Sequence, residues 1–143
     1  MLSLAILLAH LVGDYLLQTN SMAQRKTGSW KWALIHAGMY SLPYAALLFV
    51  LVGGITWPCI IALLVIGGTH AVIDRYRLAK HVIWAINNGL PHDARDSYGW
   101  AEAEANAGYT EAHPVWLKTW LMFIVDNTIH LVINAIAIAV LLH

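Results

Sequence analysis

Histidine and aspartate recur at a spacing of four residues in three apolar segments of this chain. Residues four apart lie on one face of an α-helix, so each pair presents an imidazole and a carboxylate in the same direction. Ionisable groups in apolar surroundings are costly unless they are paired, and inside membranes they usually mark a functional site. The pairs are His10–Asp14, His70–Asp74 and, in reverse order, Asp126–His130, and a further histidine, His36, stands in another apolar segment.

Imidazole and carboxylate groups are the ligand types of a transition-metal site. Four imidazoles and three carboxylates suffice for two ions, or for one ion with a general base and outer carboxylates that orient the histidines. As catalytic groups we expect the carboxylates of Asp14, Asp74 and Asp126. We predict a divalent metal, with zinc as the first choice, bound by His10, Asp14, His36, His70, Asp74, Asp126 and His130.

A single His–Asp pair also has a purely structural interpretation, because the two side chains can interact within their own helix. The recurrence of the pair in three segments, with His36 in a fourth, favours a shared site instead. The segments HLVGD and HAVID also resemble each other, which indicates a duplicated two-helix hairpin. Asn134, near the last pair, is expected to join helices rather than to bind metal.

The composition is that of an integral membrane protein. Of the 143 residues, 59% are hydrophobic and 11% charged, whereas soluble domains have roughly 25% charged residues. The formal net charge is zero, and nothing in the sequence suggests a nucleic-acid partner, which would need a basic patch or stripe. No lysine or arginine precedes the first apolar run, and His10 and Asp14 interrupt it, so we expect a retained helix rather than a cleaved signal. The single cysteine, Cys59, is expected to be a buried free thiol.

The apolar runs predict an all-α fold, an integral membrane four-helix bundle with a polar His/Asp core. A single transmembrane domain is expected to cover residues 1–143, with spans at about 2–19, 30–52, 58–76 and 115–142. Residues 81–88 either extend the third helix or form a short interfacial one. A polar cytoplasmic loop is expected at about 87–114. Its glutamates are expected in a solvated segment, although the Ala, Glu and Trp content would also allow a short interfacial helix.

All eight basic residues fall on one side of these spans, which the positive-inside rule makes cytoplasmic. Both termini are then periplasmic, in a bacterial inner membrane. Counted from the cytoplasmic helix ends, the seven candidate ligands lie in the same half of the membrane. The basic residues are Arg25, Lys26, Lys31, Arg75, Arg77, Lys80, Arg95 and Lys118.

In these motifs the chain resembles domain-of-unknown-function family 3307, a family of small bacterial and phage membrane proteins. The resemblance covers nearly the whole chain and implies a helical membrane bundle in which the motif residues act as one set. It implies no particular activity. The matching motifs are His10-x-x-x-Asp14-x-x-x-Gln18, His36, His70-x-x-x-Asp74 and Asp126-x-x-x-His130.

The first functional hypothesis is a membrane-embedded metal-dependent hydrolase that acts on a lipid or lipid-linked substrate. Arg75, Arg77 and Lys80 would bind a phosphate head group, or would only set the topology. The alternatives are a metal-ion or proton carrier or sensor, and a structural protein whose bundle is held by a metal or a His/Asp network. Membrane lipids are the expected partners, and a homodimer is compatible with the small bundle. The remaining histidines, expected in solvent, are His81, His92, His113 and His143.

Overall fold

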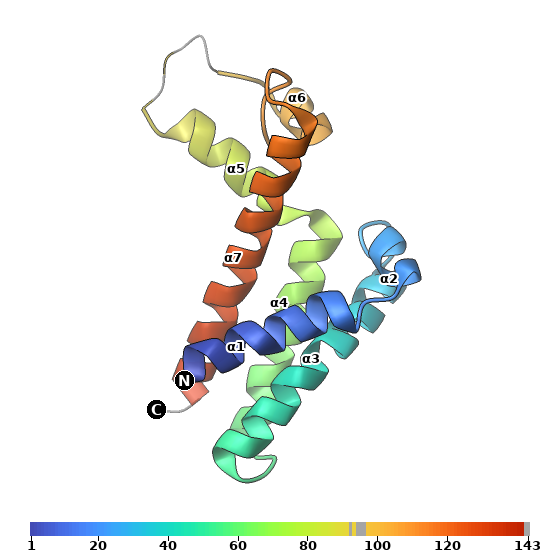
Figure 1. Ribbon diagram of the computed structural model, residues 1–143, viewed down its shortest axis with the longest axis vertical. Helices are drawn as coiled ribbons and strands as arrows, with labels where there is room; N and C mark the ends of the chain where they lie inside the picture. The colour runs from blue at the N-terminus through green and yellow to red at the C-terminus, as the bar shows by residue number, and fades with distance from the viewer. Residues whose placement is uncertain (92, 94–96, 142–143) are drawn as a thin grey trace. The chain divides into compact units, whose positions relative to one another are not determined.

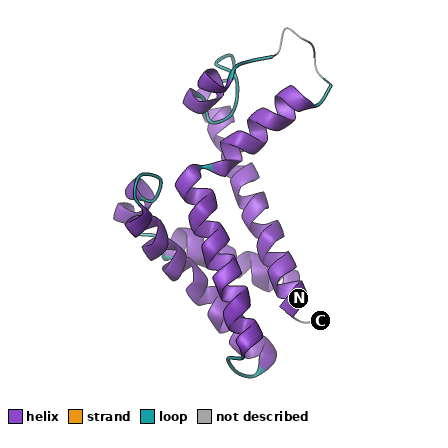
Figure 2. Cartoon of the chain, turned by 180° about the vertical axis from the view of Figure 1, so that it is seen from behind, coloured by secondary structure: helices purple, strands orange, loops and turns teal. Residues whose placement is uncertain are grey.

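The chain is all-helical, as predicted. The computed structural model describes residues 1–91, 93 and 97–141, and within these ranges it contains helices joined by loops and no strand (Figures 1 and 2). The elements are α1 (Leu2–Leu11), a π-helical turn η1 (Val12–Leu16), α2 (Asn20–Arg25), α3 (Trp30–Val52), α4 (Trp57–Tyr76), α5 (Leu78–Gly89), α6 (Trp100–Ala105) and α7 (Val115–Leu141).

Three of these helices are long and apolar enough to cross a membrane. They are α3, α4 and α7, with 23, 20 and 27 residues. Large apolar side chains on their outer faces are exposed, for example Leu64 at 70% and Val140 at 73%. A contiguous apolar exterior of this kind suits lipid rather than water. These helices indicate an integral membrane protein.

The first apolar segment is shorter than the predicted span of residues 2–19. It is helical over Leu2–Leu16 only, which corresponds to roughly 22 Å at the α-helical rise, against a hydrocarbon core of about 30 Å. Its last turn is a π-turn, in which the Leu17 N–H donates to the Val12 carbonyl at 3.0 Å. The polar residues that follow form a capped start for α2, where the Met22 N–H donates to Thr19 Oγ1.

The chain forms two compact units. The first consists of Met1–Tyr76 together with the chain from His130 onward, and the second is Arg77–Ile129.

Four helical segments build the core of the first unit. α3 and α4 form an antiparallel hairpin, and α1 runs across it in Figure 1. Gly53 turns the chain between α3 and α4 with a φ of 73°, a left-handed conformation that favours glycine. The Tyr44 hydroxyl donates to the Ile6 carbonyl at 3.2 Å and so joins α3 to α1. The buried core residues are Ile6, Ala9, Tyr40, Tyr44, Leu48, Cys59, Ala62, Ile66 and Ile138.

In the second unit, part of the predicted 87–114 loop is folded. α6 occupies Trp100–Ala105, which agrees with the alternative of a short helix in this loop. Its Ala and Glu residues are good helix formers. The Trp84 indole donates to the Tyr98 carbonyl at 3.1 Å, and the Tyr98 hydroxyl donates to the Gly108 carbonyl at 2.8 Å. Burial raises the pKa of Tyr98 and keeps this donor protonated.

Candidate metal centre

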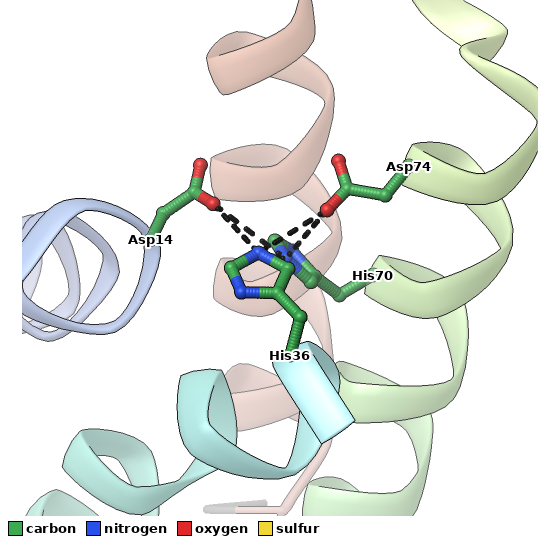
Figure 3. A group of neighbouring side chains, drawn as sticks. All are labelled: Asp14, His36, His70 and Asp74. Atoms are coloured by element: carbon green, nitrogen blue, oxygen red, sulfur yellow. Dashed lines mark hydrogen bonds and ion pairs between the residues drawn. The ribbon is translucent and has the colours of Figure 1, made fainter. Parts of the chain in front are cut away.

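Four predicted ligands meet inside the first unit: Asp14 from η1, His36 from α3, and His70 and Asp74 from α4 (Figure 3). Both histidines are fully buried, and Asp14 and Asp74 are 4% and 6% exposed. One ligand atom from each residue lies within 4.8 Å of the other three. Three elements therefore position one polar cluster inside the first unit.

The π-turn and its glycine bring Asp14 to the cluster. A Cβ on Gly13 would lie 2.7 Å from the Tyr40 carbonyl oxygen, so only glycine lets this turn approach α3 so closely. The wider π-turn rotates the residues after it relative to a regular α-helix, and such turns are frequent at functional sites. The local irregularity thus directs Asp14 toward His36.

Regular helix geometry explains the other ligands. His70 and Asp74 are one turn apart on α4 and share its inner face. His36 lies on α3, one turn before Tyr40, and the Tyr40 ring stacks on the His70 ring with centroids 3.6 Å apart. This stacking holds the His70 imidazole in a fixed plane.

The distances between the ligand atoms are close to those around a tetrahedral ion. His36 Nε2 lies 3.0 Å from His70 Nε2, 3.1 Å from Asp14 Oδ1 and 3.2 Å from Asp74 Oδ2. His70 Nε2 lies 3.2 Å from Asp74 Oδ2 and 3.7 Å from Asp14 Oδ1. A tetrahedral zinc ion with bonds of about 2.0–2.2 Å places its ligand atoms about 3.3–3.6 Å apart. The buried His/Asp cluster could therefore hold a metal ion.

Hydrogen bonds among the four cluster residues alone account poorly for the close approach of their nitrogen and oxygen atoms. A neutral imidazole has a single N–H, so Nε2 of His36 either donates one hydrogen or accepts with one lone pair. It nevertheless faces two carboxylates and the nitrogen of His70 at once. Lone pairs that point to one centre are characteristic of cation binding.

A cation of the chain itself, Lys26, reaches the same atoms. Its Nζ lies 2.7 Å from Asp74 Oδ2, 3.1 Å from His36 Nε2 and 3.5 Å from Asp14 Oδ1. From the sequence, Lys26 was interpreted only as one of the basic residues that set the membrane orientation, and its position in the cluster was not predicted. The only available signal was its place ten residues before His36, at the end of a short polar turn.

His10 and His130 lie behind the four ligand atoms. His10 Nε2 is 4.0 Å from Asp14 Oδ2, and His130 Nε2 is 3.8 Å from Asp74 Oδ1. His130 Nδ1 also lies 3.2 Å from His70 Nδ1. Each of these two predicted ligands thus faces the outer oxygen of an aspartate. That arrangement is typical of side chains that orient metal ligands.

A hydrogen-bonded group extends from His10. Its Nδ1 lies 2.8 Å from the Tyr40 hydroxyl. The Asn134 side-chain amide donates to the hydroxyls of Tyr40 and Tyr44 at 2.5 and 2.8 Å. Asn134 therefore joins α7 to α3, and its predicted function between helices is confirmed.

The remaining candidate residues are on other parts of the chain. Asp126 is on α7, four residues before His130, in the segment that forms the second unit. Arg75 binds the Thr27 carbonyl through Nη1 at 2.5 Å. His81 is exposed and stacks on Trp100. His92 and His143 lie outside the described residues.

These features define a class of protein: an all-helical chain with apolar helices of membrane-spanning length and a buried His/Asp cluster of metal-ligand type. The family model described as a protein of unknown function, DUF3307, matches residues 2–143. The chain belongs to the DUF3307 family, as its motifs predicted. No curated protein and no solved structure shows a significant match to it.

Proposed function

We propose that this chain is a membrane-embedded metal-binding protein that acts as a metal-dependent hydrolase on a lipid or lipid-linked substrate. The observation that carries the proposal is the spacing of 3.0–3.7 Å between Nε2 of His36 and of His70, and between each of these nitrogens and an oxygen of Asp14 and of Asp74. Two imidazoles with two carboxylates favour zinc over magnesium or calcium, which prefer all-oxygen sites.

The two carboxylates are not equivalent. Asp74 Oδ2 is 3.2 Å from both imidazole nitrogens, whereas Asp14 Oδ1 is 3.1 Å from one and 3.7 Å from the other. A catalytic zinc site has three protein ligands and one open position. We therefore assign His36, His70 and Asp74 as ligands and Asp14 as the general base.

The proposed hydrolysis requires few groups besides the metal ligands. A zinc ion bound here would supply Lewis acidity toward an ester or phosphoester oxygen. Asp14, held by η1 beside the cluster, would accept a proton from the attacking water. The apolar exteriors of α3, α4 and α7 favour a substrate that arrives from the lipid phase.

We place this site in a four-helix bundle of the bacterial inner membrane, with both termini periplasmic and the cluster in the cytoplasmic half. All eight basic residues fall on one side of the predicted spans, and the positive-inside rule makes that side cytoplasmic, which supports the orientation. Core residues from α1, α3, α4 and α7 support the bundle.

A metal-ion or proton carrier is the second candidate. The hydrogen-bonded group of His10, Tyr40, Asn134 and Tyr44 extends from the cluster to the Ile6 carbonyl on α1. Chains of such groups form proton relays in membrane proteins. Zinc-dependent proton or metal flux into proteoliposomes, without lipid hydrolysis, would favour the carrier.

Metal content tests the proposal. We expect detergent-purified wild type to contain zinc in proportion to chain, measured by mass spectrometry of the metal. His70→Ala should lose the metal, whereas His81→Ala, which alters an exposed histidine of the second unit, should retain it. Asp14→Asn should retain zinc and lose hydrolysis of a phospholipid panel. Wild type without zinc would overturn the metal site, and loss of zinc in Asp14→Asn would overturn its assignment as base.

A further inference from the structure

Lys26 uses the atoms that the proposed metal would use. Its Nζ contacts Oδ1 of Asp14, Oδ2 of Asp74 and Nε2 of His36 at 2.7–3.5 Å. These are three of the four ligand atoms of the cluster. The lysine side chain is only 15% exposed. Its ammonium group therefore lies in the cluster rather than in solvent.

An ammonium group and a metal ion cannot share these atoms. The His36 nitrogen that is hydrogen-bonded with Nζ, and the two carboxylate oxygens that form ion pairs with it, are atoms that would bind the metal. A divalent ion at about 2.0–2.2 Å from the ligand atoms would lie close to Nζ, where two like charges repel strongly in a low dielectric. Occupancy by Lys26 and occupancy by a metal are thus mutually exclusive.

Charge explains why a lysine is useful in the metal-free cluster. Asp14 and Asp74 are almost fully buried, and uncompensated buried carboxylates are strongly destabilising. The contacts of Lys26 with both carboxylates supply a positive charge in place of the ion. The cluster can therefore stay folded without metal.

The backbone around Lys26 is fixed while its side chain is long. Arg25 lies over the Trp32 ring, 5.3 Å from its centroid, and the Thr27 carbonyl accepts from Arg75 at 2.5 Å. These contacts hold the residues on either side of Lys26. The flexible four-carbon side chain can leave the cluster without movement of the backbone.

We propose that Lys26 is an internal cation that occupies the cluster in the metal-free protein and is displaced when a metal binds. This inference rests on the proposed metal site. It makes Lys26 a competitor that sets the affinity for metal and couples metal binding to exposure of one amine.

Zinc titration of the full-length protein in detergent, against a chromophoric chelator, gives the first test. Lys26→Met keeps an unbranched side chain as far as Cε and removes the charged ammonium group. It should bind zinc about tenfold more tightly or better, the effect expected from removing a competing charged contact. The matched control is Lys31→Met, which alters an exposed lysine and should leave the affinity unchanged.

Amine labelling of the wild type gives the second test and does not depend on the folding of a variant. Lys26 should react severalfold faster with an amine-specific reagent in zinc than in chelator, as measured by peptide mass spectrometry. Lys31 should react equally in both.

The outcomes separate the two proposals. If wild type binds zinc, and neither the affinity of Lys26→Met nor the labelling of Lys26 changes, the competition by Lys26 is wrong and the metal site stands. If neither wild type nor Lys26→Met binds zinc, the metal site itself is wrong, and the inference fails with it.

Discussion

At the scale of single residues, His130 is the clearest example of a side chain that acts through another. If His70 binds metal through Nε2, its Nδ1 must carry the hydrogen and donate to His130 Nδ1, 3.2 Å away. The hydrogen of His130 is then on Nε2, which faces Asp74 Oδ1 at 3.8 Å. His130 therefore fixes the tautomer of His70 from behind.

His130→Ala should weaken zinc binding without abolishing it. Loss of an outer partner typically costs about 10–100-fold in metal affinity, so the variant should lie between wild type and His70→Ala in a competitive zinc titration. His81→Ala serves as the control. Affinity equal to that of wild type, or complete loss of zinc, would contradict the assignment of His130 as a side chain that orients a ligand without binding the ion.

The residue types of this site could be predicted from the sequence. The sequence could not show which of these residues bind the ion and which only contact one of its ligands. Pairs such as His70–Asp74 are visible because helix periodicity and the cost of buried charge are local properties. Whether His10 binds the ion or faces Asp14 depends on side-chain rotamers and helix crossing, which no spacing encodes. Lys26 was hidden because the positive-inside rule already accounted for a lysine at that helix end.

At the scale of elements, the π-turn η1 is the feature on which the position of Asp14 depends. Gly13→Ala would place a Cβ 2.7 Å from the Tyr40 carbonyl oxygen and 2.9 Å from its ring. The backbone of α3 cannot yield at low cost, so we expect a destabilisation of about 1–3 kcal/mol and weaker zinc binding.

Gly38→Ala on α3 is the matched control, because a Cβ there meets no atom within 4 Å. Thermal unfolding in detergent should show a lower midpoint for Gly13→Ala and an unchanged or slightly higher one for Gly38→Ala. Equal midpoints and equal zinc affinities for the two variants would show that the close approach of η1 to α3 is unimportant.

The long helices could be predicted because twenty apolar residues in a row have few alternatives. The bounds of α3 agree with the predicted 30–52, and those of α4 with 58–76 to within one residue. The π-turn could not be predicted, because its i to i+5 hydrogen bond results from packing of Gly13 on α3 rather than from local propensity. The sequence left open whether the segment of α6 is a loop or a helix, because this helix is six residues long in a charged segment.

At the scale of the whole molecule, the proposed orientation rests on the positions of the basic residues. A reporter active only in the periplasm should be active when fused to either end of the chain. The same reporter inserted after Glu111, in the connection between α6 and α7, should be inactive. Periplasmic activity at Glu111 would reverse the orientation and place the cluster in the other half of the membrane.

The central claim is that one metal ion is bound among the side chains of Asp14, His36, His70 and Asp74. Anomalous diffraction at the zinc absorption edge, from crystals of the zinc-loaded protein, tests it most directly. We predict a peak about 2.0–2.2 Å from Nε2 of His36 and of His70, with Lys26 turned away from the cluster. An empty cluster with Lys26 Nζ still between the two aspartates, in protein saturated with zinc, would contradict it.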